Sequence, residues 1–205
     1  MNTVTHFYSL LSPWAYLSWR DAVRITTQHG ARLNHKLVTL PEVFEANGGE
    51  PASRKSEAKQ RYREMELQRW AEFRGVSLRV KPTNHPFDDG LASRLVIAAE
   101  QDGDNGHRLA YAMMRKLWHD DADLSDQDML RRVVSSEGFD TTALFDAAEQ
   151  PQVRDKLAEN TTLAIERGVF GVPTYAVGDQ IYWGQDRLDF VERHVRIVTP
   201  AAVGD

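Results

Sequence analysis

The fold is decided by a stretch near the start of the chain, Val4-Thr5-His6-Phe7-Tyr8-Ser9-Leu10-Leu11-Ser12-Pro13-Trp14-Ala15. It opens with mostly β-branched and aromatic residues, a run short enough for one strand. Ser12-Pro13 then predicts a helix start, because serine can cap the free amides of a first turn and proline lacks only an N–H that has no partner there. We expect this helix to run to about His29, with Gly30 closing it, and a second strand to cover Arg32–Leu40. A strand, a helix of crossover length and a strand predict a parallel βαβ unit.

The end of the chain predicts a β-hairpin and a last helix. Thr174–Val177 and Gln180–Trp183 have strand character and are separated only by Gly178-Asp179, which predicts a tight turn. Asp186 can cap a helix that continues through Val195. The C-terminal part is therefore a ββα unit.

The segment between these two units predicts helices, over Ser53–Arg74, Leu91–Glu100, Arg108–Trp118, Met129–Ser135 and Leu157–Arg167. In the first of them an apolar stripe recurs at helical spacing and is flanked by Leu67 and Trp70; its members are Ala58, Tyr62, Met65 and Phe73. Ser125-Asp126-Gln127-Asp128 predicts a capping box ahead of the fourth helix.

A βαβ half and a ββα half around one sheet are the parts of a thioredoxin fold. We therefore predict an α/β, thioredoxin-like fold with a large all-helical insertion. The thioredoxin-like domain is expected to be discontinuous, with residues 1–41 and 169–198, and the inserted helical domain to comprise residues 42–168. Residues 199–205 are expected to form a flexible tail.

Composition disfavours several classes of protein. The chain of 205 residues has no apolar run near the roughly 18 residues of a membrane span and no basic region before its apolar start. We therefore expect a cytoplasmic protein without a signal peptide and without a membrane partner. The net charge of −5 disfavours a nucleic-acid partner.

Cysteine is absent, which excludes disulfides, thiolate zinc sites, cysteine nucleophiles and CxxC redox pairs. Any sulfur chemistry must therefore use the sulfur of a ligand. The acidic run His119-Asp120-Asp121-Ala122-Asp123 lacks the glycine and the glutamate of a calcium loop, and the remaining histidines lack HxxxH spacing. We expect no metal, and nothing in the sequence places a base beside Ser12 for a Ser-His-Asp triad.

The fold predicts where the chemistry lies. In a thioredoxin-like layout the N-terminus of the first helix meets the loop that enters the third strand, which places Ser12-Pro13 beside Val172-Pro173, a proline that is commonly cis in this layout. The helix N-terminus favours an anion, and the Ser12 hydroxyl can donate to it. A thiolate held there would be stabilised.

Three stretches, Phe7–Tyr16, Gly168–Thr174 and Tyr182–Leu188, resemble in the same order the 2-hydroxychromene-2-carboxylate isomerases, which belong with the kappa-class glutathione transferases among DsbA-like proteins. Gln68-Arg69-Trp70 in the inserted helix adds to a resemblance that spans most of the chain. Ser9 and the segments 48–51 and 81–89 depart from the usual family residues.

The resemblance implies glutathione as cofactor and assigns its contacts. The resemblance implies that Ser12 is the catalytic residue and that the glutathione sulfur lies beside it. The backbone of the glutathione cysteine is expected to contact Val172, next to a cis Pro173. Its γ-glutamyl end is expected near Gln185 and Asp186, and Lys59 near its glycine carboxylate, although Asp186 suits a helix cap equally well and Lys59 suits a solvated helix face. Trp14 is expected either in the core or as a wall of the pocket for an aromatic substrate.

The resemblance implies a glutathione-dependent isomerase of a small aromatic acid. Its reaction would be similar to the interconversion of 2-hydroxychromene-2-carboxylate and trans-o-hydroxybenzylidenepyruvate. Reversible thiolate addition would turn a locked double bond into a rotatable single bond. Two alternatives stay open: a kappa-like transferase that conjugates electrophiles, and a non-catalytic DsbA-like binding scaffold. The family also suggests a homodimer.

Overall fold

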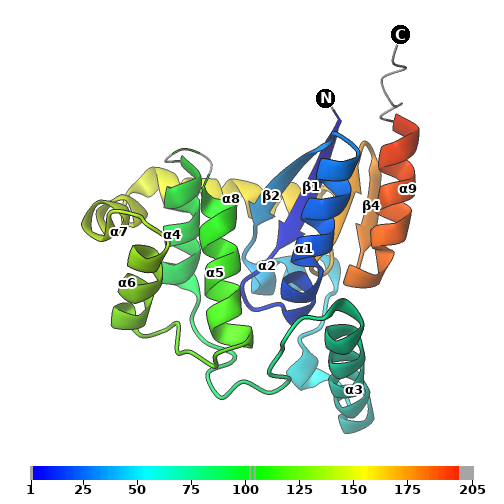
Figure 1. Ribbon diagram of the computed structural model, residues 1–205, viewed down its shortest axis with the longest axis horizontal. Coiled ribbons are helices and arrows are strands. Elements are labelled where there is room, and N and C mark those ends of the chain that lie inside the picture. Colours follow the sequence, from blue (N-terminus) through cyan, green and yellow to red (C-terminus); the bar gives the residue numbers. More distant parts are fainter. Residues whose placement is uncertain (1, 102, 104, 199–205) are drawn as a thin grey trace.

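A four-stranded mixed sheet in the order β2-β1-β3-β4 organises the structure, a computed structural model that describes residues 2–101, 103 and 105–198 (Figure 1). Strands β1 (Thr3–Tyr8) and β2 (Arg32–Leu37) pair in parallel and are joined by helix α1 (Pro13–Gln28). The predicted βαβ unit is confirmed. The predicted tail, 199–205, lies outside the described residues.

The C-terminal hairpin has the predicted bounds. Strand β3 (Thr174–Val177) runs antiparallel to β1 and to β4 (Gln180–Trp183). A short 3-10 turn, η2 (Gln185–Arg187), leads into helix α9 (Leu188–Val198). The α/β fold class is confirmed.

Helices fill the segment between the two units. They are α2 (Leu40–Asn47), the 3-10 turn η1 (Ala52–Arg54), α3 (Glu57–Arg74), α4 (Gly90–Gln101), α5 (Gly106–Trp118), α6 (Gln127–Ser136), α7 (Thr141–Ala148) and α8 (Pro151–Glu166).

Both faces of the sheet are covered because strand side chains alternate between them. On one face Val4 packs with side chains of α1 and α9. On the other face Phe7 packs with Val43 of α2 and Ala164 of α8. A larger core extends from Tyr8 through α1 into α4 and α5, so the helical segment and the sheet share buried side chains. The domain boundaries at residues 42 and 168 stay a prediction.

Several local predictions were wrong in their boundaries. Strand β2 ends at Leu37 rather than Leu40, because Pro41 occupies the first turn of α2, where its missing N–H costs nothing. Asp126, not Ser125, caps α6 by accepting a hydrogen bond from the amide of Asp128, while Ser125 bonds to the preceding Asp123. The sequence does not predict helix α7, and α8 begins at Pro151 rather than at the predicted Leu157, more than one and a half turns earlier.

The apolar stripe predicted for α3 does not face the core. Leu67 and Ala71 are the buried residues of this helix. Tyr62, Met65 and Phe73 are instead 56%, 45% and 80% exposed. The reason is that α3 lies at the periphery of the molecule and packs mainly against α1, so most of its surface faces solvent (Figure 1).

Two kinds of feature are absent from the described residues. None of their helices is long and apolar enough to cross a membrane. No group of three or more histidine or acidic side chains among them is arranged to hold a metal ion.

Candidate active site

Ser12 joins the start of α1 to the loop before β3. The side chain is 4% exposed, and its Oγ accepts a hydrogen bond from the Ala15 amide at 3.2 Å, which makes Ser12 the N-cap of α1. The same hydroxyl donates to the carbonyl oxygen of Val172 at 3.3 Å. The Val172–Pro173 peptide bond is cis. The structure thus brings together Ser12, Val172 and Pro173, as the fold prediction required.

The loop that leads into Ser12 is fixed by side chains from distant helices. Trp118 Nε1 of α5 donates to the carbonyl of Leu10 at 3.1 Å, and His85 Nε2 contacts the carbonyl of Leu11 at the same distance. Buried Ser9 accepts the Leu11 amide on its Oγ and the Ser12 amide on its carbonyl. Backbone held at three consecutive residues positions the Ser12 hydroxyl before any ligand arrives.

His85 is a part of this site that the sequence did not reveal. Burial is the main cause that lowers the pKa of its imidazole; its bond to Leu11 acts in the opposite direction, and the charge of Arg63 lowers the pKa further. The ring is therefore neutral near pH 7, with Nε2–H as the donor, since a carbonyl can only accept. Its partner lies 74 positions away, so no local spacing could have indicated this contact.

The loop on the opposite side of the site is closed against β4. The Gly184 amide donates to the carbonyl of Pro173 at 2.9 Å. A Cβ on Gly171 would lie 2.7 Å from Trp183 Nε1, so a larger residue would force that ring to shift. Phe170 packs against Trp183 with ring centroids 4.8 Å apart, and both rings are partly open to solvent.

Gln185 presents an unsatisfied buried acceptor. The residue is 4% exposed, and its Oε1 has no hydrogen-bond partner among the described residues. Its backbone carbonyl accepts from Arg74 of α3 at 2.8 Å, and that guanidinium also pairs with Asp21 of α1. An orphaned buried acceptor costs free energy unless a ligand donates to it.

The other predicted site residues, Asp186, Lys59 and Trp14, make no described hydrogen bond to Ser12, Val172 or Pro173. Asp186 lies inside η2, where its carboxylate pairs with Arg187 at 3.2 Å, so the prediction that it caps the last helix was wrong. The helical stretch already begins with η2 directly after Gly184, so Asp186 lies inside it rather than at its cap. Lys59 is exposed in the first turns of α3, and Trp14 is half-buried against the core formed with α4 and α5.

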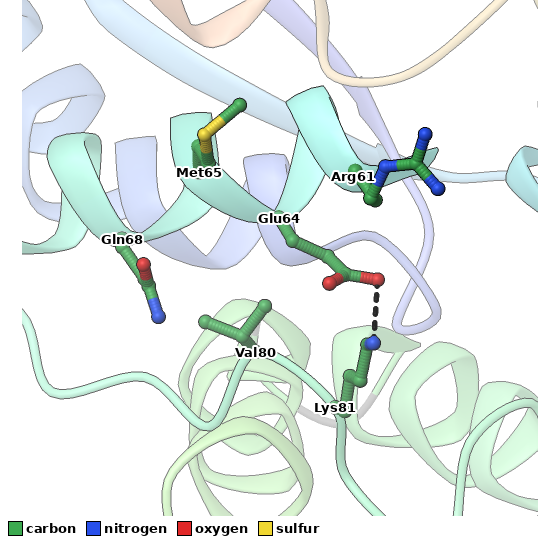
Figure 2. Close-up of a pocket in the computed structure, with 6 residues that line it drawn as sticks. All are labelled: Arg61, Glu64, Met65, Gln68, Val80 and Lys81. Atoms are coloured by element: carbon green, nitrogen blue, oxygen red, sulfur yellow. Dashed lines mark ion pairs between the residues drawn. The ribbon is translucent and has the colours of Figure 1, made fainter. Parts of the chain in front are cut away.

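A cavity of about 490 Å³ opens between α3 and the segment that follows it (Figure 2). Met65 and Val80 supply apolar wall, and Glu64 forms an ion pair with Lys81 at 2.8 Å across it. Gln68 of the Gln68-Arg69-Trp70 motif also lines this cavity. None of the predicted site residues does.

Two groups in this part of the structure match what glutathione would need. The tripeptide carries an ammonium group that needs an acceptor, and the buried Gln185 Oε1 is an acceptor without a donor. Its thiol, once ionised, needs donors, and the N-terminus of α1 offers free amides beside the Ser12 hydroxyl.

Comparison with known proteins agrees with this fold. The DSBA-like thioredoxin domain family matches residues 3–196. A 2-hydroxychromene-2-carboxylate isomerase of Sphingobium xenophagum is 28% identical over 195 residues, 95% of this chain and 98% of that protein. An enzyme of the same name from Pseudomonas sp. (strain C18) is 31% identical over 94% of this chain and 89% of its own.

Solved structures give the same result. A 2-hydroxychromene-2-carboxylate isomerase superposes with a TM-score of 0.82 at 26% identity, over 96% of this chain and 95% of that chain. The cytosolic disulfide reductase DsbM of Pseudomonas aeruginosa, solved with GSH, superposes with a TM-score of 0.64 at 19% identity, over 95% of this chain and 99% of its own, and so shares the fold. The thioredoxin-like fold with a helical insertion is therefore confirmed.

Proposed function

We propose, since the chain belongs to the 2-hydroxychromene-2-carboxylate isomerase family of DSBA-like thioredoxin-domain proteins, that it is a glutathione-dependent isomerase of a small aromatic acid. The relatives of that name support an isomerase. One observation carries the glutathione dependence. In a chain without cysteine, the Ser12 hydroxyl lies at a helix N-terminus and is bonded to the carbonyl that precedes a cis-proline. This is a place for the thiolate of a ligand.

Each residue of the site then has a defined task. Bound glutathione would supply a thiol that adds reversibly to a conjugated carbon of the substrate. Ser12 donates its hydroxyl hydrogen to the sulfur, a role that requires the proton to turn away from the Val172 carbonyl. The backbone of Val172, beside Pro173, pairs with the backbone of the tripeptide. The aromatic ring of Trp14 forms a wall for the acid.

The two ends of the tripeptide have separate partners. Gln185 Oε1 accepts from the ammonium group, an interaction that satisfies a buried acceptor. Asp186 lies next to it in η2 and adds a negative charge for the same group. Lys59 reaches the glycine carboxylate from α3.

The experiment has two steps. Calorimetric titration with reduced and with oxidised glutathione tests the cofactor, and saturable binding of the reduced form is expected. 2-Hydroxychromene-2-carboxylate is then added, and both the products and the thiol are quantified. Formation of the isomer with full recovery of thiol supports the proposal. Accumulation of a conjugate would instead identify a kappa-like transferase, and no binding at millimolar glutathione would leave a non-catalytic scaffold.

We propose further that the chain forms a homodimer in the cytoplasm, where glutathione is kept reduced. Tyr62, Met65 and Phe73 place three large apolar side chains on one exposed side of α3, a surface that a second copy can cover. Sedimentation should give a dimer for the wild type and a monomer for Phe73→Glu. Phe190→Glu on α9, at a residue 54% exposed, is the matched control and should stay dimeric. A monomeric wild type would contradict this assembly.

A further inference from the structure

Helix α3 directs two arginines toward the rest of the protein. Residues three, four and seven apart share a helix face, so Arg63, Leu67 and Arg74 lie on one side of α3. Leu67 is completely buried, which identifies this side as the inner one. Arg63 is half-buried, one turn before Leu67.

The two arginines differ in their partners. Arg74 pairs with Asp21 and donates to the Gln185 carbonyl. Arg63 forms neither an ion pair nor a hydrogen bond with any residue that the structure describes. The adjacent Glu64 acts on it electrostatically, but that carboxylate is bound to Lys81. Burial lowers the pKa of the Arg63 guanidinium, as expected for a cation that has lost water without gaining a partner.

Arg63 also lies within electrostatic reach of the candidate active site. Its charge lowers the pKa of His85, whose imidazole bonds to Leu11, the residue before Ser12. His85 itself is neutral near pH 7 because burial lowers its pKa. The ion pair between Glu64, next to Arg63, and Lys81 joins this part of α3 to the segment that contains His85. Arg63 is therefore a cation without a described partner beside the segment that holds the loop before Ser12.

We infer that Arg63 is a carboxylate-binding residue of this site, an inference that rests on the proposed function. A guanidinium offers planar paired donors that match the two oxygens of a carboxylate, and a partly desolvated site strengthens the pair. The proposed reaction contains two sources of this group, the glycine end of glutathione and the aromatic acid. Arg63 takes one of them.

Calorimetry on three variants identifies the source. Arg63→Met keeps the apolar stem without the charge. Arg63→Lys keeps the charge without the paired N–H donors of the guanidinium. Arg69→Met is the matched control, since Arg69 lies on the exposed side of the same helix and pairs there with Glu66. The ligands are glutathione, γ-glutamylcysteine, which lacks the glycine, and benzoate as a simple aromatic carboxylate.

Arg63→Met should weaken one ligand about 10- to 100-fold, the range for a lost charged hydrogen bond, with partial recovery in Arg63→Lys and no change in Arg69→Met. Weaker glutathione with unchanged γ-glutamylcysteine assigns Arg63 to the glycine carboxylate. Weaker benzoate with unchanged glutathione assigns it to the acid substrate. Changes below about twofold for all ligands would overturn the inference. A wild type that binds benzoate through Arg63 but no glutathione would refute the proposed function alone.

Thermal unfolding without ligand supplies a second readout. Arg63→Met should keep or raise the melting temperature, because no described partner is left unpaired, whereas Arg74→Met should lower it by stranding Asp21 and the Gln185 carbonyl. The ligand that Arg63 binds should then stabilise the wild type and Arg69→Met more than Arg63→Met. Equal destabilisation by Arg63→Met and Arg74→Met would mean that Arg63 is structural.

Discussion

Replacing Ser12 by alanine removes two interactions that the structure assigns to one hydroxyl. As the N-cap of α1 it accepts the Ala15 amide, and as a donor it satisfies the Val172 carbonyl. Loss of an N-cap costs about 1 kcal/mol, and a buried carbonyl left without a donor adds about 1–2 kcal/mol. We therefore expect Ser12→Ala to lower the free energy of unfolding by about 2–3 kcal/mol. For a chain of this size that corresponds to a melting temperature lower by roughly 4–12 °C.

The effect on chemistry is separate from the effect on stability. A free thiol has a pKa of about 8.5, so roughly 3% of it is thiolate at pH 7, whereas a site that lowers the pKa to about 7 ionises half of it. Without the Ser12 hydroxyl, the bound thiol should titrate one to two pH units higher. At neutral pH the thiolate fraction, and with it the rate of isomerisation, should therefore fall about 5- to 50-fold. Ultraviolet titration of the thiolate in the complex measures the shift, and the pH profile of the rate should move with it.

Asp140→Ala is the matched control for the loss of a cap. Asp140 caps α7 by accepting the Ala143 amide at 3.0 Å, the same geometry as Ser12 in α1, at an exposed surface site. It should lose about 1 kcal/mol of stability and leave the thiolate titration unchanged. Ser12→Gly separates the roles further, because glycine replaces a serine cap at a cost of only a few tenths of a kcal/mol. An unchanged thiol titration in both Ser12→Ala and Ser12→Gly would refute the role of Ser12.

Three further predictions concern buried polar groups. Gln185→Leu removes the orphaned acceptor, so the ligand-free protein should keep or gain stability. Calorimetry should show that glutathione binds at least about 10-fold more weakly to this variant. An unchanged affinity would mean that Gln185 does not contact the ligand. Arg74→Met should cost about 2 kcal/mol in urea unfolding, a figure reduced because Asp21 is 37% exposed, and a neutral result would mean that this pair contributes nothing. Burial lowers the pKa of His6 from 6.5 to about 3, so the unfolded chain takes up a proton that the folded chain refuses. Stability should therefore fall by about 2 kcal/mol between pH 7 and pH 5 from His6 alone, with His35 acting in the same direction, and His6→Phe should flatten that slope.

Local chemistry explains which parts of the fold were predictable. The start of α1 follows from Ser12-Pro13, and the hairpin follows from Gly178-Asp179 between two strand-forming runs, because both signals act within a few residues. The meeting of Ser12 with Val172 also followed, because a thioredoxin layout has only one place for each segment.

The orientation of α3 could not be predicted in the same way. Its apolar residues are spread around the helix, and a stripe that includes Tyr62 and Phe73 competes with a line through Leu67 and Ala71. The choice between them depends on the partner surface, which is α1, and on the anchor that Arg74 makes to Asp21. Neither can be seen in the sequence of the helix itself.

The helical segment contributes directly to the candidate active site. Two of the bonds that hold the loop before Ser12 come from Trp118 at the end of α5 and from His85 in the segment before α4. In a site without cysteine the position of a ligand sulfur depends on a hydroxyl and on backbone amides, so a loop free to move would lose the alignment of all of them together. Trp118→Phe should therefore keep the buried ring but release the Leu10 carbonyl. We expect this variant to lose more in the rate of isomerisation than in its affinity for glutathione. A larger loss of affinity than of rate would mean that α5 only completes the core.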